Sequence, residues 1–312
     1  MLTGTKFPTD LSLRGSWRDH LDPDHLRSRL QVAKAVLVTD TGIDDPVAFA
    51  ELAELVIGPL TADLGEHPRA SGGTDGVFSP VEFDRTQKLL WHNENSFDRQ
   101  PPGAIAFGCL VPAEQGGETP VVLGSDVYAD LPDDLVERFT RHGVRYVRRF
   151  HPGLGRSWPQ IFGTDDRDRV AAICADQDID LTWDGDVPQT SATRPAAHFD
   201  ASRGVWSWVN QAQHWHPSCL PTPVRQSMRT LFGDSPPRDC TFGDGSPISD
   251  ATMSTILRSY ARHERATPWR PGDVLIVDNL NVAHARNPYS GPRELLVAMG
   301  PKATVNDRPA AR

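Results

Sequence analysis

Short apolar stretches recur along the chain, and the strongest of them lie toward its two ends. Residues 104–111, 273–278 and 293–299 form nearly continuous apolar runs, which are typical of buried strands. Residues 143–150 instead alternate between apolar and polar side chains, as a strand with one buried face does. The pattern predicts a β core to which both ends of the chain contribute.

Other segments of the chain have apolar residues at helical spacing. Residues 44–53 combine an aspartate cap, an early proline and apolar positions at helical intervals. Three more helices are predicted at residues 125–141, 168–174 and 250–263.

These elements predict a mainly β fold with α, in which a double-sheet core carries a mixed helical insertion at about residues 125–265. We expect one domain over residues 1–312, preceded by a polar, extended arm of about residues 1–25. A doubly wound α/β sheet fits less well, because strands and helices do not alternate regularly.

Composition narrows the class of protein. Hydrophobic residues make up 38% of the 312 positions, enough for a sizeable core, and the 25 glycines and 27 prolines favour a loop-rich β protein over a helical bundle. The formal net charge of −9 argues against a nucleic-acid partner, which usually requires a basic face.

Cysteine use and the first residues bear on the compartment. The four cysteines are widely spaced, with no CxxC pair, so we expect a reduced, cytoplasmic protein without a cysteine zinc site. The sequence starts without the apolar segment of a signal peptide, and no apolar run approaches the length of about 18 residues that a membrane helix needs. A soluble protein without a membrane partner is predicted.

Three polar side chains carry the candidate chemistry. His92 and Glu94 are two positions apart, so that in an extended strand they would share one face, and His284 follows an apolar strand far along the chain. Two imidazoles and one carboxylate are the facial triad of non-heme iron(II) oxygenases. The alternatives are a solvated loop for the first pair and a half-buried, hydrogen-bonded histidine for His284.

Candidate carboxylate-binding groups lie near these residues. Arg286 and Arg293 follow His284, and a guanidinium can grip a carboxylate through two parallel hydrogen bonds. Arg293 opens an apolar strand, which favours an inward orientation over that of a surface arginine. Thr119 follows a glycine-rich turn and offers a hydroxyl, although it could equally be the first residue of a strand.

Five ordered motifs resemble one family. The chain is similar to the taurine dioxygenase-like branch of iron(II)/2-oxoglutarate-dependent oxygenases, and within it to the syringomycin-biosynthesis-type hydroxylases of amino acids. The resemblance covers roughly residues 58–300 and rests on residues 91–96, 116–120, 242–248, 269–279 and 284–293.

This resemblance implies a double-stranded β-helix, or jelly roll, and a set of site residues. His92, Glu94 and His284 would bind iron(II), with 2-oxoglutarate and O2 as cosubstrates. Thr119 and Arg293 would hold 2-oxoglutarate, with Arg286 as the competing arginine, because both arginines lie closer to His284 than the family's spacing. The glutamate also weighs against halogenation, since halogenases of this class lose the carboxylate.

The substrate is predicted from the resemblance and from a few nearby residues. We expect hydroxylation of an amino acid or a related metabolite of secondary metabolism, free or tethered to a carrier protein, with desaturation or cyclisation as alternatives. The acidic net charge favours a free small molecule over an acidic carrier. A metal-dependent hydrolase and a non-catalytic β-sandwich binding module are the competing classes. Candidate substrate-binding residues are Asn95, Arg69, Arg194 and Asn210.

Overall fold

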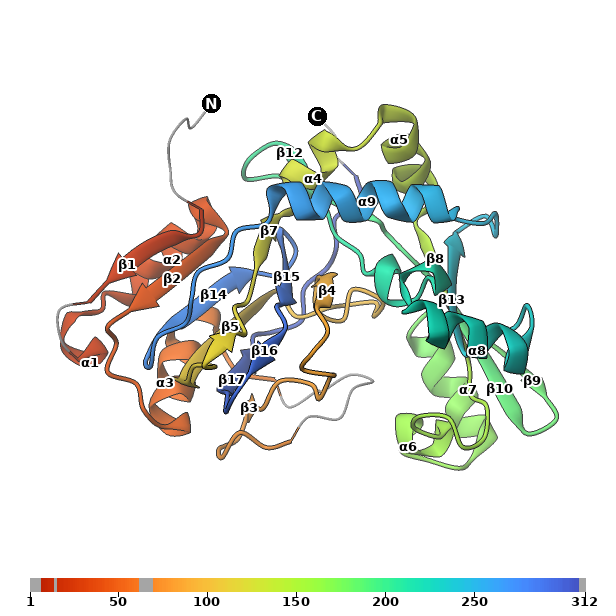
Figure 1. Ribbon diagram of the computed structural model, residues 1–312, viewed down its shortest axis with the longest axis horizontal. Coiled ribbons are helices and arrows are strands. Elements are labelled where there is room, and N and C mark those ends of the chain that lie inside the picture. The colour runs from red at the N-terminus through yellow and green to blue at the C-terminus, as the bar shows by residue number, and fades with distance from the viewer. Residues whose placement is uncertain (1–6, 14–15, 62–69, 309–312) are drawn as a thin grey trace.

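The computed structural model describes residues 7–13, 16–61 and 70–308. A six-stranded sheet forms one half of the molecule, on the left in Figure 1. β1 and β2 pair in parallel and all other neighbours in this sheet are antiparallel. In spatial order the strands are β1 (Thr9–Ser12), β2 (Ala35–Thr39), β14 (Val274–Asp278), β5 (Ala104–Val111), β17 (Glu294–Met299) and β3 (Val77–Phe78).

A smaller antiparallel sheet packs against one face of the first. It consists of β4 (Leu89–His92), β15 (Val282–Arg286) and β7 (Val121–Leu123), with β15 in the middle. A two-stranded ribbon of β6 (Gln115–Gly116) and β16 (Tyr289–Ser290) lies beside it. The predicted double-sheet core is therefore confirmed.

Alternating side chains divide the apolar surface of the six-stranded sheet between two clusters. Val36 and Ile276 pack under α2 (Pro23–Ala33) and α3 (Pro46–Ile57), while Leu37, Phe107 and Val277 point the other way and pack against the smaller sheet. Burial of such a side chain contributes about 1.5–3 kcal/mol. Both faces of the sheet are covered, which explains why its strands read as continuous apolar runs.

The N-terminal segment does not form the predicted polar arm. Residues 9–12 join the main sheet as β1, and the short helix α1 (Trp17–His20) follows. Leu13 and Trp17 are buried in the cluster beneath α2 and α3. Leu11 packs partly against the same cluster. These few apolar side chains hold in place a stretch that is otherwise polar enough to suggest an exposed arm.

Helix ends follow the capping residues in the sequence. The Asp45 carboxylate accepts hydrogen bonds from the backbone N–H groups of Val47 and Ala48 at 2.7 and 2.9 Å, and α3 begins at Pro46. Helix α9 (Asp250–His263) begins after Ser249, whose hydroxyl accepts from the Thr252 N–H. The predicted bounds of 250–263 are confirmed.

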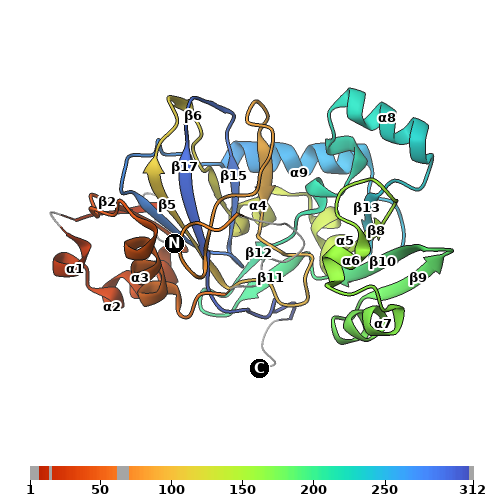
Figure 2. The ribbon, with the colours of Figure 1, turned by 90° about the horizontal axis from the view of Figure 1, so that it is seen from below.

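The helical insertion lies between β7 and β14, and most of it forms the end of the molecule opposite α1–α3 (Figures 1 and 2). Its four-stranded antiparallel sheet has the order β13 (Arg238–Phe242), β8 (Val144–Arg149), β10 (Val187–Arg194) and β9 (Asp180–Asp184), and β11 (Ala197–Asp200) pairs with β12 (Val205–Trp208). The remaining helices are α4 (Gly124–Asp130), α5 (Asp133–His142), α6 (Trp158–Phe162), α7 (Arg167–Asp176), α8 (Thr222–Phe232) and the 3-10 turns η1 (Ala212–His214) and η2 (Pro217–Cys219).

Two features of the insertion bear on the predicted elements. The helix expected at 125–141 is split at Leu131 and Pro132, because proline has no N–H to continue the ladder of α4. α9 contacts both β7 and η2 and so links the core with the insertion.

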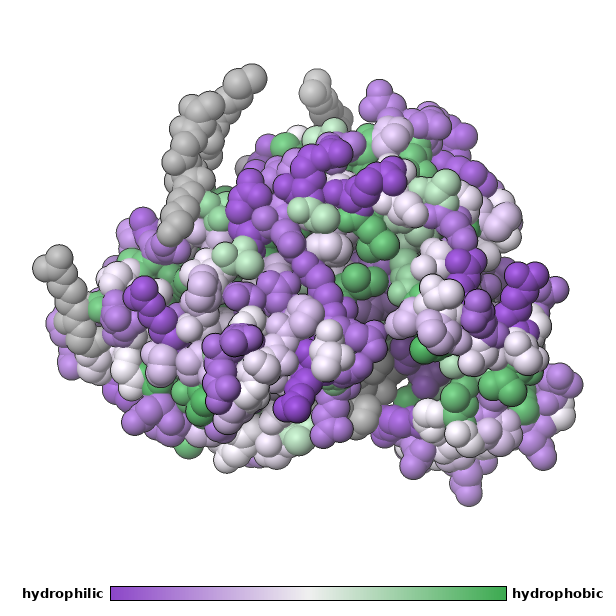
Figure 3. Space-filling model, viewed as in Figure 1, coloured by the Kyte–Doolittle hydropathy of each residue, from purple (hydrophilic) through white to green (hydrophobic). Residues whose placement is uncertain are grey.

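None of the helices in the described residues has the length and apolarity to cross a membrane. Polar residues cover most of the face in Figure 3, and hydrophobic ones form small separate patches.

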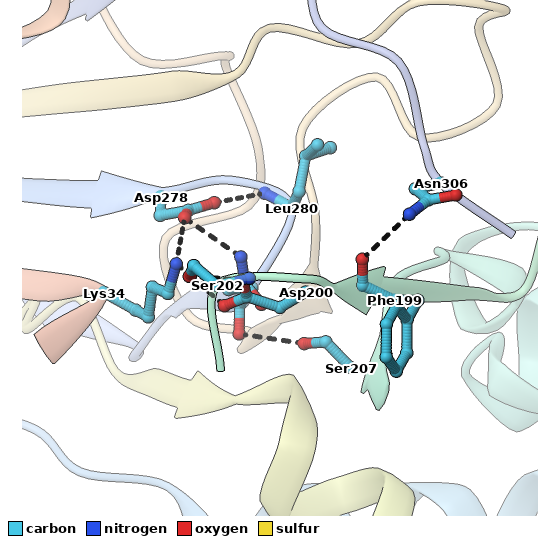
Figure 4. Close-up of polar contacts among 9 residues, drawn as sticks. Lys34, Phe199, Asp200, Ser202, Ser207, Asp278, Leu280 and Asn306 are labelled. Carbon is cyan, nitrogen blue, oxygen red and sulfur yellow. Dashed lines mark hydrogen bonds and ion pairs between the residues drawn. The ribbon is translucent and has the colours of Figure 1, made fainter. Parts of the chain in front are cut away.

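A buried ion cluster joins the insertion to the core (Figure 4). The Lys34 ammonium lies 2.8 Å from a carboxylate oxygen of Asp200 in β11 and 3.2 Å from one of Asp278 at the end of β14. The Lys34 and Asp200 side chains are only 5% and 6% exposed. Asp278 also accepts from Asn281, so the cluster fixes the turn that leads into β15.

Candidate metal centre and its cavity

The two candidate metal-binding histidines are neighbours across the smaller sheet. His92 is the last residue of β4, and His284 lies directly opposite it in β15. Glu94 points between them: its Oε2 lies 3.9 Å from His92 Nε2 and 3.7 Å from His284 Nε2. One potential ligand atom from each of the three residues lies within 4.8 Å of the other two.

The path by which Glu94 reaches the histidines differs from the prediction. His92 and Glu94 do not share a strand face, because β4 ends at His92 and Glu94 lies in the turn that follows. Asn95 supports this turn with a left-handed backbone, φ 51°. The turn folds the carboxylate back toward the two imidazoles.

Burial and hydrogen bonding prepare His92 as a neutral nitrogen donor. Its Nδ1 lies 2.9 Å from the Leu90 carbonyl, so Nδ1 carries the proton and Nε2 presents its lone pair toward Glu94. Burial, reinforced by the neighbouring His284 and His214, holds the pKa of His92 well below its usual value. A neutral imidazole is the form that binds a metal.

A buried asparagine fixes the backbone of Glu94. Asn279 follows β14, is fully buried, and accepts a hydrogen bond from the Glu94 N–H at 2.8 Å. Its amide group donates to the carbonyls of Glu94 and Pro102 at 3.0 and 2.8 Å. The Asn93 side chain in turn donates to the Asn279 carbonyl at 2.7 Å. The end of β14 therefore determines where the carboxylate lies.

Arg293 and Thr119 lie on the same cavity as the three candidate ligands. The ribbon of β6 and β16 brings them together, and Arg293 Nε donates to the Gly117 carbonyl at 3.0 Å. Gly117 has φ 76°, and a Cβ there would lie 3.1 Å from the Arg293 side chain. Burial lowers the pKa of Arg293 to about 10, so it remains charged at neutral pH. The Thr119 hydroxyl accepts from the Trp269 indole at 3.3 Å.

Arg286 lines the cavity but makes a different set of contacts. Its guanidinium donates to the carbonyls of Phe83, Asp84 and Gln87 at 3.1, 2.6 and 2.6 Å. These bonds hold the 83–87 loop against β15. Arg293 has one hydrogen bond among those described, through Nε, which leaves its terminal nitrogens as the better candidates for a bound carboxylate.

The cavity has a volume of about 310 Å³, and its lining includes residues beyond those predicted from the sequence. Phe107 from β5 packs on the His284 ring, with centroids 5.0 Å apart. His214 meets the His92 ring edge-on, with centroids 4.7 Å apart, and Arg238 lines the side of the cavity toward the insertion. The run of polar and aromatic residues at 213–216 is the one sequence signal that could have indicated this wall.

The predicted substrate-binding residues that the structure describes do not line the cavity. Arg194 donates to the carbonyls of Phe97, Gln177, Asp178 and Thr193, and Asn210 bonds the backbone of Ala196 and Ala212. Neither these two nor Asn95 is among the described residues that line the cavity. Their polar groups satisfy buried backbone instead, which corrects the prediction for Arg194 and Asn210. Arg69 lies outside the described residues.

The donor set fits a divalent iron ion. Two imidazole nitrogens and one carboxylate oxygen, all less than a tenth exposed, are a ligand set that leaves coordination positions open. Arg293 and Thr119 on the same cavity fit an anionic cosubstrate.

Comparison with known proteins decides the family. The model of the taurine catabolism dioxygenase TauD, TfdA family matches residues 4–299. The chain belongs to this family. As a TauD/TfdA family member it is an iron(II)- and 2-oxoglutarate-dependent dioxygenase, as predicted, and its two facing sheets are the jelly-roll core. The hydrolase and binding-module alternatives are set aside.

Two relatives resemble this TauD/TfdA protein over most of their length. The dapdiamide synthesis protein DdaC of Enterobacter agglomerans is 31% identical over 267 residues, covering 85% of this chain and 81% of that protein. A clavaminate synthase-like protein of Arabidopsis thaliana is 31% identical over 287 residues, covering 88% and 84%.

Solved structures share the fold at low sequence identity. A putative alpha-ketoglutarate-dependent taurine dioxygenase from Burkholderia xenovorans aligns with a TM-score of 0.53 at 15% identity, over 95% of this chain and 87% of that one. PvcB from Pseudomonas aeruginosa aligns with a TM-score of 0.52 at 14% identity, over 93% and 84%. These likenesses concern the fold of the chain.

Proposed function

We propose that this dioxygenase hydroxylates a C–H bond of an amino acid or an amino-acid-derived metabolite, with iron(II) bound by His92, Glu94 and His284. The observation that carries the proposal is the convergence of Nε2, Nε2 and Oε2 on one buried point of the 310 Å³ cavity. Similarity to a dapdiamide synthesis protein and to a clavaminate synthase-like protein supports a role in natural-product biosynthesis.

Each side chain has a defined task in this proposal. Bound iron(II) with 2-oxoglutarate and O2 supplies the oxidising chemistry. Arg293 holds the far carboxylate of 2-oxoglutarate in a charge-assisted contact, and the Thr119 hydroxyl is its second polar contact. Phe107 and the strand residues Leu295 and Val297 form an apolar wall that keeps water from the reacting centre. Asn279 keeps Glu94 in place.

The first experiment tests the metal centre. Purified protein with iron(II) and 2-oxoglutarate should show a weak visible charge-transfer band without oxygen, and should release succinate when oxygen is admitted. His284→Ala should abolish both signals. His25→Ala, an exposed position on α2, is the matched control and should keep both. A wild-type protein with neither band nor succinate would overturn the proposal.

A second experiment identifies the reaction. Free and carrier-tethered amino acids are incubated with the loaded enzyme, and the products are examined by mass spectrometry. A gain of one oxygen atom supports hydroxylation, whereas a loss of two hydrogens indicates desaturation or cyclisation. The substrate whose turnover depends on both oxygen and 2-oxoglutarate defines the activity.

A further inference from the structure

A second cavity adjoins the one that contains the candidate metal ligands. Its volume is about 500 Å³, and it shares His214, Trp215 and Arg238 with the first. Its other described walls come from the insertion: the end of β8, the 150–156 segment, the residues around η2, Met228 of α8, and the start of β13. A ligand could therefore extend from one cavity into the other past these three shared side chains.

Positive charge is concentrated in this second cavity. Four arginines line it, and none of the other described lining residues is acidic. The chain as a whole has a net charge of −9, so this is a local departure from an acidic average. We call this site the arginine groove, defined by Arg148, Arg149, Arg156 and Arg238.

Neighbouring groups orient the arginine side chains. The Arg148 guanidinium stacks over the Phe150 ring at 4.4 Å, and that of Arg238 lies over Trp215 at 5.0 Å. Arg149 donates to the Pro236 carbonyl at 2.9 Å. Side chains held in this way lose less conformational freedom when they bind a ligand.

Two of the arginines are direct cross-strand neighbours in the four-stranded sheet. Arg238 at the start of β13 is the antiparallel partner of Arg148 in β8. Both side chains line the second cavity, so an anion bound there is within reach of guanidinium groups from two neighbouring strands.

Apolar side chains complete the arginine groove. Phe150, Leu154, Leu220 and Met228 line it together with the arginines. A site lined by both apolar side chains and arginines fits an elongated molecule that has an apolar stretch and an anionic oxygen-bearing group. A phosphate and a carboxylate share this chemistry, since both accept two parallel hydrogen bonds from a guanidinium.

We propose that the arginine groove binds the anionic end, a phosphate or a carboxylate, of an elongated substrate whose reactive carbon lies in the metal-containing cavity. The inference rests on the proposed function only for the position of the reactive end. According to this inference, the insertion selects the substrate through Arg238 and the neighbouring residues of the arginine groove.

The test is calorimetric titration of the protein loaded with iron(II) and 2-oxoglutarate in the absence of oxygen, so that the cosubstrate already occupies its own site. Three probes of equal chain length are compared at one ionic strength: n-hexyl phosphate, hexanoate and 1-hexanol. At least one of the two anions should bind about tenfold or more tightly than the alcohol. The tighter anion identifies phosphate or carboxylate as the preferred group.

Variants locate the binding. Arg156→Gln, at a half-buried position, and Arg149→Gln should each weaken binding of the preferred anion about tenfold. Arg156→Lys should retain part of the affinity because it keeps the charge. Arg258→Gln removes the same charge from the exposed face of α9 and should have no effect. Equal binding of the alcohol, no binding of any probe, or an equal loss in Arg258→Gln would overturn the arginine groove.

The charge-transfer band of the loaded wild-type protein separates the two proposals. If the band is present and the anions do not bind, the arginine groove is wrong and the proposed function stands. If the band is absent while the anions bind with the expected dependence on Arg149 and Arg156, the assignment of the metal centre fails instead.

Discussion

His284 lies directly opposite His92 in the antiparallel pairing of β15 with β4, and the two ring centroids are 4.3 Å apart. The register of two strands therefore sets the separation of the two nitrogen donors. A shift by one residue would turn His284 to the other face of the sheet, away from Glu94. The rigid pairing explains how segments so distant in the sequence can form one buried site.

The two arginines near the site should respond differently to truncation. Arg293→Ala removes the proposed carboxylate contact and should raise KM for 2-oxoglutarate at least about tenfold, because a charge-assisted hydrogen bond contributes about 1.5–3 kcal/mol. Arg286→Ala removes three bonds to the 83–87 loop and should chiefly lower the melting temperature. Steady-state kinetics and thermal unfolding of both variants measure this difference. The reverse pattern would transfer the cosubstrate role to Arg286.

Asn279 is expected to act as a positioning residue for Glu94. Asn279→Ala leaves the buried Glu94 N–H and two carbonyls without their partner and should cost about 2–4 kcal/mol of unfolding free energy. Affinity for iron(II) should fall as well, measured by titration of the charge-transfer band. Asn306→Ala, which loses a 3.3 Å contact to Phe199, is the control. Unchanged iron affinity in a folded Asn279→Ala protein would contradict the positioning role.

The stability of the metal-free protein should depend on pH through His92. The unfolded chain protonates this imidazole near pH 6.5, whereas burial keeps the pKa of the folded state well below that value. The unfolded state then binds the extra proton, so the free energy of unfolding falls as pH drops below about 6.5, by about 1.4 kcal/mol per pH unit from this group.

Urea unfolding with a chelator at several pH values between 7.5 and 5 measures this slope. His92→Gln should make it shallower over that range, because the variant has no proton to gain at this position; the half-buried His198, whose pKa is also lowered, keeps its own share. His25→Gln, at an exposed position, should keep the wild-type slope. Identical slopes for wild type and His92→Gln would show that His92 is not the group responsible.

The Lys34 cluster should be essential for stability. Lys34→Met leaves the Asp200 carboxylate, 6% exposed, without its cation and should cost about 3–5 kcal/mol. Arg18→Met breaks an ion pair with Glu51 whose two side chains are half exposed, and should cost less than about 1 kcal/mol. Chemical denaturation gives both values. Equal losses of unfolding free energy in the two variants would mean that burial of the Lys34 cluster does not add to its contribution to stability.

Local sequence patterns account for much of the fold. The bounds of α9 and β5 agree with residues 250–263 and 104–111, because caps and apolar runs mark both elements unambiguously. β1 was missed, since Leu11, Leu13 and Trp17 are too few to produce a periodic signal in a polar stretch. Its place in the sheet depends on a parallel pairing with β2, which leaves no local trace in the sequence.

The residue types of the candidate site could be predicted from the sequence motifs, but their arrangement in space could not. His92, Glu94 and His284 could be singled out by residue type, but the register that joins them could not. Arg194 and Asn210 were misread because a buried polar side chain looks the same in sequence whether it meets a ligand or a backbone carbonyl. His214 and Arg238 reach the cavity only through the packing of the insertion on the smaller sheet.

The insertion between β7 and β14 provides His214, Trp215 and Arg238, while the metal-binding side chains proposed here belong to β15, to β4 and to the turn that follows it. On the proposed assignment, reactivity and recognition would occupy separable stretches of one polypeptide. Mutations in the insertion would then alter which compound is accepted while the donor atoms stay where the strands hold them. Divergence toward a new substrate would require no rebuilding of the two facing sheets.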